Sequence, residues 1–330
     1  MGRIAFIFPG QGSQAVGMAA AVAAASPVAA AVFAEADRAL GEPLSRLAWE
    51  GPADELDRTE NAQPALVAAS IAILAALRER WAAEGLPEPE PAFAAGHSMG
   101  QYSALVAAGS LDLADAVRLV RERGRRMQAS GGLRPGGMAA ILGLDEARLP
   151  ELVERASAHG VFAVANRNAP GQIVVSGERP AIEAAREIGR ELGARRVVVL
   201  PVSVAAHSAL MAEAADGMAH VLDRVPFADP HPPLLANADA RPLADAAAAR
   251  AELVEHLTRG VDWVAVVQRM TDEGVDTFIE IGPGKVLAGL VKRIAPAATV
   301  LATDDPSAEG GLALPDLRPR VLVTHPSRPD

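Results

Sequence analysis

The chain has 330 residues, of which 50% are hydrophobic and 22% are charged, which is typical of a globular protein with one large or two smaller domains. Its formal net charge of −10 and its aromatic content of 3% argue against binding to nucleic acid or anionic lipid. It contains no cysteine, which excludes disulfides, thiol catalysis and cysteine-ligated metal.

The first part of the chain alternates between strand and helix patterns. Residues 3–8, "RIAFIF", and residues 91–96, "PAFAAG", are predicted to be buried strands, and helical patterns lie between them. This alternation predicts an α/β fold. The longest apolar run, 65–77, is shorter than the ~20 residues of a membrane span and is interpreted as a buried helix. Since the N-terminus also lacks a signal-peptide pattern, we expect a cytoplasmic protein with no membrane segment.

A second unit is predicted after residue 130. Its expected elements are strand 136–144, helix 145–158, strands 161–166 and 172–177, helix 178–192 and strand 195–203. This β-α-β-β-α-β order is that of a ferredoxin-like unit. We therefore expect a larger α/β body formed by 1–130 and 204–305, a ferredoxin-like subdomain inserted at 131–203, and a flexible tail at 306–330.

Residues 96–100, "GHSMG", match the Gly-x-Ser-x-Gly pattern of a nucleophile elbow, which requires a strand before it and a helix after it. Both are predicted here, so Ser98 is a candidate nucleophile. The backbone N–H groups that follow it would lie at a helix N-terminus and could stabilise an oxyanion. A glycine-rich turn with an incidental serine remains the alternative.

A serine nucleophile needs a base, and the chain has seven histidines. His97 is adjacent to Ser98, but neighbours on a sharp turn usually point apart. His207 follows the last strand of the inserted unit, where the chain re-enters the body and a cleft edge is expected. His207 is therefore the candidate base, with an ordinary histidine at a helix start as the alternative.

Residues 111–128 predict a helix with one apolar stripe. Arg123 lies at the border of this stripe, and we expect it to be partly buried. The other four arginines of the helix are expected to face away from the stripe: Arg118, Arg121, Arg125 and Arg126. A buried arginine needs a carboxylate or phosphate partner. The pattern alone favours an internal salt bridge over a substrate contact.

Together these segments resemble the malonyl-CoA:acyl-carrier-protein transacylases of fatty acid and polyketide synthesis. The resemblance covers roughly residues 3–305 and is carried by "FPGQGSQAVGM" (8–18), "GPADELDRTENAQPAL" (51–66), "GHSMGQYSALVAAGSL" (96–111), "RLVRERGRRMQ" (118–128), "NRNAPGQIVVSG" (166–177), "PVSVAAHSALM" (201–211) and "IEIGPGKVLAGLVKRI" (279–294). The combination of "FPGQGSQ" with "GHSxG" is highly specific.

The resemblance implies a role for each matching position. Ser98 would be the acyl-accepting nucleophile, His207 its base, and Arg123 the partner of the malonate carboxylate. The backbone N–H groups of Gln11 and Met99 would form the oxyanion hole. Four further residues would line the site: Gln63, His97, Asn168 and His256.

The same resemblance implies a hydrolase-like body with a parallel sheet, carrying the ferredoxin-like insert. It implies an [acyl-carrier-protein] S-malonyltransferase that takes malonyl-CoA as substrate and the phosphopantetheine arm of an acyl carrier protein as acceptor. No metal and no bound cofactor are expected, and we expect a monomer.

Three positions depart from the family pattern. Gln101 stands where many members have glutamate, and His256 stands where many have a glutamine whose backbone carbonyl orients the catalytic histidine. The residues before His207 are 204–206, "VAA", which leaves the selectivity for malonyl over branched units open.

Competing functions remain at this point. The chain could be an esterase or thioesterase, a non-catalytic partner of a carrier protein, or another member of the family. The last group includes a stand-alone acyltransferase of a polyketide pathway and the transferase of a malonate decarboxylase. Because carrier proteins are generally acidic, docking would need basic residues, for which the candidates are Arg190, Arg195, Arg196, Lys285 and Lys292.

Overall fold

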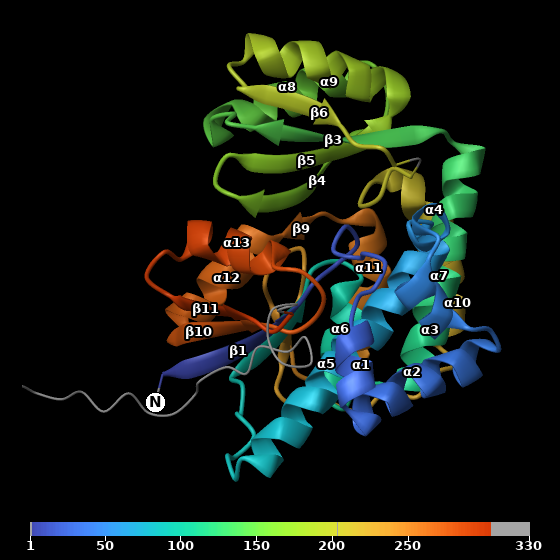
Figure 1. Ribbon diagram of the computed structural model, residues 1–330. Helices are drawn as coiled ribbons and strands as arrows, with labels where there is room; N and C mark the ends of the chain where they lie inside the picture. Colours follow the sequence, from blue (N-terminus) through green and yellow to red (C-terminus); the bar gives the residue numbers. More distant parts are fainter. Residues whose placement is uncertain (1, 203, 305–330) are drawn as a thin grey trace, which may run out of the picture.

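The computed structural model describes residues 2–202 and 204–304, and the tail predicted at 306–330 lies outside them. The described chain has a mixed α/β architecture with two separate sheets (Figure 1). One sheet has six strands and the other has five.

The larger sheet has the strand order β11-β10-β1-β2-β7-β8. Its strands are β1 (Arg3–Phe8), β2 (Phe93–Gly96), β7 (Leu234–Leu235), β8 (Pro242–Leu243), β10 (Val275–Glu280) and β11 (Thr299–Ala302). β1 lies near the centre and pairs in parallel with β2 and β10, so the carboxyl ends of these strands meet at one edge. β1 confirms the strand predicted at 3–8, and β2 begins two residues later than predicted.

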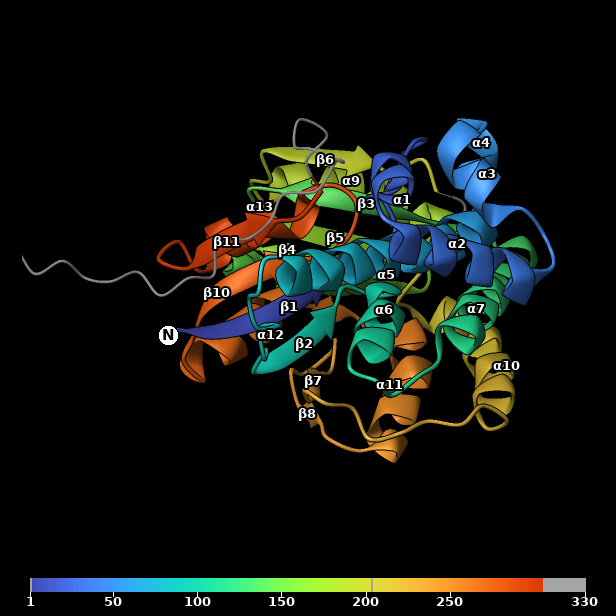
Figure 2. The ribbon, with the colours of Figure 1, turned by 60° about the horizontal axis from the view of Figure 1, so that its bottom comes forward.

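The helices of this larger part lie against the sheet or in a group beside it (Figure 2). They are α1 (Ala20–Ala25), α2 (Pro27–Leu40), α3 (Leu44–Glu50), α4 (Ala53–Leu56), α5 (Thr59–Ala83), α6 (Gly100–Ala107), α7 (Leu113–Leu133), α10 (Ala212–Leu222), α11 (Ala246–Thr258), α12 (Trp263–Asp272) and α13 (Val286–Ile294). By length and composition α5 could cross a membrane, but 83% of its most apolar window is buried inside the protein. It packs against α2 and α7, as expected of the buried helix predicted at 65–77.

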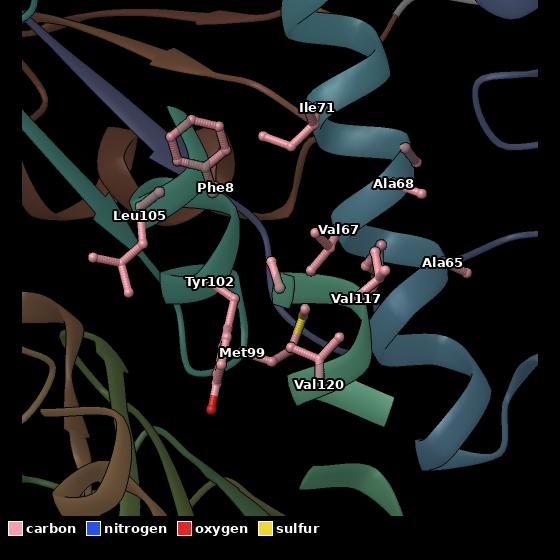
Figure 3. Packing of buried hydrophobic residues seen from close by; sticks show 14 of the residues in the cluster. Phe8, Ala65, Val67, Ala68, Ile71, Met99, Tyr102, Leu105, Val117 and Val120 are labelled. Atoms are coloured by element: carbon pink, nitrogen blue, oxygen red, sulfur yellow. The ribbon is translucent and has the colours of Figure 1, made fainter. Parts of the chain in front are cut away.

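The main hydrophobic core lies next to the turn that carries the candidate nucleophile. Phe8 at the end of β1 and Met99 beside the turn pack together with side chains of three helices (Figure 3). These side chains include Val67 and Ala68 of α5, Tyr102 and Leu105 of α6, and Val117 and Val120 of α7. Close packing on this side gives the turn a rigid base.

The smaller sheet has the order β6-β3-β5-β4-β9. Its elements are β3 (Gly136–Leu142), η1 (Glu146–Arg148), α8 (Leu149–Ser157), β4 (Phe162–Ala169), β5 (Gln172–Glu178), α9 (Arg179–Glu191), β6 (Arg196–Val199) and β9 (Val261–Asp262). All pairings are antiparallel except that of β4 with β9. Helices α8 and α9 pack on this sheet, while α12 and α13 of the larger part contact β4 (Figure 1).

The predicted elements of this unit are confirmed with changed boundaries. The helix expected from residue 145 starts as the single 3₁₀ turn η1 before α8 begins. Of the strand expected at 195–203, the described part, 195–202, contains the shorter β6, and residue 203 lies outside the described residues. The side chain of Asp145 caps η1 by accepting a hydrogen bond from the backbone N–H of Ala147 at 3.0 Å, as the sequence predicted for a helix start at this position.

One expectation for α7 is wrong. Arg121, predicted to face away from the apolar stripe, is only 6% exposed and donates hydrogen bonds to Glu42 and Asn61. Since both α2 and α5 pack against α7, the helix is covered over more of its circumference than one stripe. Arg123 is more deeply buried than predicted, at 1% exposure.

Candidate active site

Ser98 lies on a sharp turn between β2 and α6, as the elbow pattern predicts. Its φ of +52° is in the left-handed region, which residues other than glycine rarely adopt. A Cβ on Gly96 would lie 1.9 Å from the carbonyl carbon of Gly100, and one on Gly100 would lie 2.4 Å from the carbonyl oxygen of Phe8. Both positions therefore require glycine, and the turn presents the serine side chain.

His207 lies opposite this serine. The two residues are 109 positions apart in sequence, and His207 Nε2 is 2.9 Å from Ser98 Oγ. His207 Nδ1 donates to the backbone carbonyl oxygens of His256 at 2.5 Å and Arg259 at 3.1 Å. Because carbonyl oxygens only accept, the proton is on Nδ1 and the Nε2 lone pair faces Ser98.

The surroundings of His207 keep its ring neutral. Burial and the nearby positive charge of Arg123 lower the pKa of His207 to about 3, against an opposing effect of the bond to the His256 carbonyl. In the described part of the chain no carboxylate contacts Nδ1. The pair is therefore a Ser-His dyad oriented by backbone carbonyls, without the acid of a serine-hydrolase triad.

Arg123 is the third residue of this cluster. Its Nη1 donates to Gln63 Oε1 at 2.8 Å, and its Nη2 donates to Ser98 Oγ at 3.2 Å and to His256 Nε2 at 3.3 Å. Burial lowers the pKa of Arg123 to about 10, so the guanidinium remains protonated near pH 7.

No salt bridge to Arg123 occurs among residues 2–202 and 204–304. The internal salt bridge favoured by the helical pattern is therefore wrong for this part of the chain. A buried cation with only neutral hydrogen-bond acceptors around it is costly unless an anion joins it. The position fits a carboxylate that arrives next to Ser98.

The two backbone groups proposed for the oxyanion hole lie at the same edge. Gln11 follows β1 and Met99 follows Ser98, and both border one cavity with Ser98. A Cβ on Gly10 would lie 2.4 Å from the carbonyl oxygen of His97, so the absence of a side chain lets the two segments touch. Within the described residues neither Gln11 nor Met99 donates a hydrogen bond from its backbone N–H.

The ring of His97 contacts residues other than the dyad. Its Nε2 donates to Asn168 Oδ1 at 2.9 Å, and its ring lies 5.6 Å from that of Trp263. Desolvation lowers the pKa of His97. Since Asn168 belongs to β4, this hydrogen bond connects the elbow with the smaller sheet.

A cavity of about 480 Å³ opens onto these residues between the two parts of the fold. Ser98, His207 and Arg123 lie along its wall together with Asn168. Its other side is mainly apolar and includes Met138, Val174, Leu200, Leu287 and Leu290. The cavity is of the size and mixed polarity that small-molecule sites have.

Sequence reasoning missed two residues that hold the elbow. Asn237 Oδ1 accepts from the backbone N–H of Ser98 at 2.8 Å, and Asn237 Nδ2 donates to the carbonyl oxygen of Gly96 at 3.1 Å. The buried Glu252 in turn accepts from the backbone N–H of Asn237 at 2.6 Å. Neither residue belongs to a motif, so no local signal could have identified them.

Gln101, one of the departures from the family pattern, does not reach the cavity. It is fully buried, accepts from the backbone N–H of Gly96 at 2.9 Å and donates to the carbonyl oxygen of Leu235 at 2.9 Å. Its amide therefore joins β2 to β7. We predict that the replacement alters the surroundings of the site more than its chemistry, since the Gln101 amide hydrogen-bonds to the backbone of β2 and β7.

Comparisons with known proteins agree with this arrangement. The acyl transferase domain family matches residues 5–303, and the chain belongs to this family. It is 46% identical over 308 residues to the malonyl CoA-acyl carrier protein transacylase of Escherichia coli K12, covering 93% of this chain and 98% of that protein.

Solved structures of such proteins are also similar. The malonyl-CoA:acyl carrier protein transacylase of Xanthomonas oryzae superposes with a TM-score of 0.87 at 41% identity, covering 93% of this chain and 96% of that one. A malonyl-transacylase in complex with its type II PKS acyl-carrier protein has a TM-score of 0.84 at 41% identity, covering 91% and 95%.

Proposed function

We propose that this protein transfers the malonyl group of malonyl-CoA to the phosphopantetheine thiol of an acyl carrier protein, through a malonyl ester of Ser98. The observation that carries the proposal is the buried Arg123, which has no carboxylate partner in the described chain and lies 3.2 Å from Ser98 Oγ. A free carboxylate on the acyl group would supply the missing anion. The names of the E. coli and X. oryzae relatives support the same substrate and acceptor.

In the first half-reaction His207 Nε2 takes the proton of Ser98 Oγ while this oxygen attacks the thioester carbon. The backbone N–H groups of Gln11 and Met99 would hold the oxyanion, and one such donor is typically worth ~3 kcal/mol of barrier. The imidazolium is stabilised through Nδ1 by the carbonyls of His256 and Arg259. The C–S bond then breaks, His207 returns the proton to the sulfur, and CoA leaves.

In the second half-reaction the carrier thiol gives its proton to His207 and attacks the ester carbonyl. The C–O bond to Ser98 breaks, and the proton returns to Ser98 Oγ. The product is malonyl thioester and free enzyme, a ping-pong cycle in which no metal or bound cofactor takes part. The apolar wall formed by residues such as Leu200 and Leu290 would accommodate the arm and limit the access of water to the ester.

We also propose the finer description of the fold. The parallel strands and their flanking helices would form a hydrolase-like body of 1–130 and 204–305, with a ferredoxin-like unit at 131–203. The antiparallel order β6-β3-β5-β4 supports the second assignment. It places the first and third strands of the βαββαβ unit, β3 and β5, at the centre and the second and fourth, β4 and β6, on either side of them. A cytoplasmic monomer without nucleic-acid or membrane partners remains our prediction.

The test is incubation with malonyl-CoA followed by intact-mass measurement. We expect a malonyl adduct on the wild-type protein, its absence in Ser98→Ala, and its transfer to a holo carrier protein added afterwards. Release of free malonate at the same rate with and without carrier would instead support the esterase or thioesterase alternative. Absence of any adduct would support a non-catalytic carrier-binding protein.

The same experiment addresses the pathway. Carrier proteins of fatty acid synthesis are the acceptors we expect, while the similarity to a malonyl-transacylase bound to a type II PKS carrier makes a polyketide carrier the alternative. Transfer rates to both kinds of carrier, measured side by side, distinguish the two.

A further inference from the structure

The imidazole of His256 is buried beside Arg123 and makes a contact there that the backbone of His256 does not make. The carbonyl of His256 holds His207, whereas its ring faces a different residue. Its Nε2 lies 3.3 Å from Arg123 Nη2, and its ring centroid lies 6.4 Å from that of Tyr102 at a near-perpendicular angle. The side chain is 0% exposed.

The protonation state of this ring follows from its neighbour. A guanidinium only donates, so Nε2 must accept and the ring proton must be on Nδ1. Burial, followed by the positive charge of Arg123, lowers the pKa of His256 well below 6.5, which agrees with a neutral acceptor. Within the described residues Nδ1 has no hydrogen-bond partner. A buried donor without a partner, such as Nδ1 of His256, lowers the free energy of unfolding. A contribution to stability therefore does not explain why a histidine occupies this position.

Arg123 is held at two of its nitrogens by neutral acceptors. Gln63 Oε1 accepts from Nη1 at 2.8 Å, and His256 Nε2 accepts from Nη2 at 3.3 Å. The remaining contact of Nη2 is to Ser98 Oγ, and Nε has no partner in the described chain. Acceptors on both sides restrict rotation of the planar group and leave donors directed towards the serine.

We propose that the His256 side chain is a positioning residue that orients Arg123 and so determines the preference for acyl groups with a free carboxylate. This assignment rests on the proposed function. Gln63 cannot replace the contact between His256 and Nη2 of Arg123, because Gln63 accepts from the other terminal nitrogen, Nη1. Without His256 the guanidinium keeps its charge but gains freedom to turn, and a carboxylate must then order it on binding.

The test compares malonyl-CoA and acetyl-CoA as donors in three variants, using the rate of acyl-Ser98 formation. His256→Gln keeps an acceptor at the end of the side chain, and His256→Leu has a similar volume without one. Leu253→Val, a buried change on the same helix, controls for general loosening of α11. Melting temperature is measured for each.

We expect His256→Leu to lower the malonyl-to-acetyl rate ratio on the order of tenfold to a hundredfold, the usual effect of losing one hydrogen bond to a charged group. His256→Gln should keep the ratio within about threefold of wild type, and Leu253→Val should keep it whatever its melting temperature. The melting temperature of His256→Leu should not fall in proportion to the ratio, because the variant also removes the unsatisfied Nδ1.

A wild-type ratio in His256→Leu would overturn the assignment, as would an equal loss in His256→Gln and His256→Leu. If the leucine variant does not fold, His256→Asn replaces it, since the shorter amide does not reach Nη2 and the same loss is expected. Failure of the proposed function would look different: the wild-type protein itself would form no malonyl adduct.

Discussion

Glu252 and His256 lie one turn apart on α11, and each holds one member of the dyad. Glu252 accepts from the backbone N–H of Asn237, whose side chain accepts from the backbone N–H of Ser98. The carbonyl of His256 accepts from His207 Nδ1. A single helix thus sets the position of the nucleophile relative to its base, although the two residues come from distant parts of the chain.

This relationship predicts that Asn237→Ala slows acylation of Ser98 on the order of a hundredfold. The variant removes the acceptor of the Ser98 N–H and the donor to Gly96, so the left-handed turn can relax and misplace Oγ. The KM for malonyl-CoA should change little, because Arg123 is untouched. Rapid-quench measurement of the acyl-enzyme burst checks this. Asn237→Asp, which keeps the acceptor, should retain more activity, and a wild-type burst in Asn237→Ala would contradict the interpretation.

Arg123→Ala should reduce malonyl transfer much more than acetyl transfer. The guanidinium is the one buried charge beside Ser98 among the described residues, and an acetyl group offers it no anion. A charge-assisted pair lost from the transition state costs on the order of 10²-fold or more. Steady-state kcat/KM with both donors gives the comparison. Equal losses with the two donors would remove the carboxylate role.

The pH dependence of acylation should reveal the effect of Arg123 on His207. His207 acts as a base only when neutral, so kcat/KM falls as the pH drops through the pKa of its ring. With a pKa of about 3, the wild-type profile with acetyl-CoA should stay flat between pH 5 and 7 within about twofold.

In Arg123→Gln the second-largest cause of the low pKa of His207, the charge of residue 123, is gone, while burial, the largest cause, remains. The acid limb should therefore move upwards, towards 6.5. Acetyl-CoA serves for both proteins, because it has no carboxylate to pair with Arg123. Identical profiles for the two proteins would show that the charge does not act on His207.

Buried ionisable groups also predict how stability depends on pH. Three histidines have lowered pKa values: His97, His207 and His256. The unfolded chain binds protons at these sites below about pH 6.5, whereas the folded chain binds them only at lower pH, so they destabilise the fold as the pH falls. Burial raises the pKa of Glu252 and Glu280 to about 7, so between pH 7 and 4.5 these two act in the opposite direction.

The free energy of unfolding should therefore decrease gently between pH 6.5 and 5, where the three histidines outnumber the two glutamates by one, and steeply below pH 4.5, where the glutamates no longer compensate. Each uncompensated proton contributes about 1.4 kcal/mol per pH unit. Urea unfolding at pH 7, 5.5 and 4 measures this. Glu252→Gln, which removes one compensating group, should lose more stability than wild type between pH 7 and 5.

Local sequence patterns identified those strands and turns whose formation depends on a few consecutive residues. The strand at 3–8 follows from its unbroken apolar run, and the elbow around Ser98 follows from two glycines between a strand and a helix. The candidates Ser98, His207 and Arg123 were each visible, but each had an ordinary alternative. The family resemblance, carried by "FPGQGSQ" and "GHSMG", connected them before any geometry was known.

The sequence by itself determined the residue types of the site and the strands and helices that carry them, because hydrophobic periodicity and glycine turns act over a few residues. The tertiary structure alone decided which partners meet. It placed His207 Nε2 against Ser98 Oγ, left Arg123 without a carboxylate in the described chain, and brought Asn237 to the elbow. These contacts join residues separated by up to 139 positions, and only the packing of the two sheets and α11 brings such residues together.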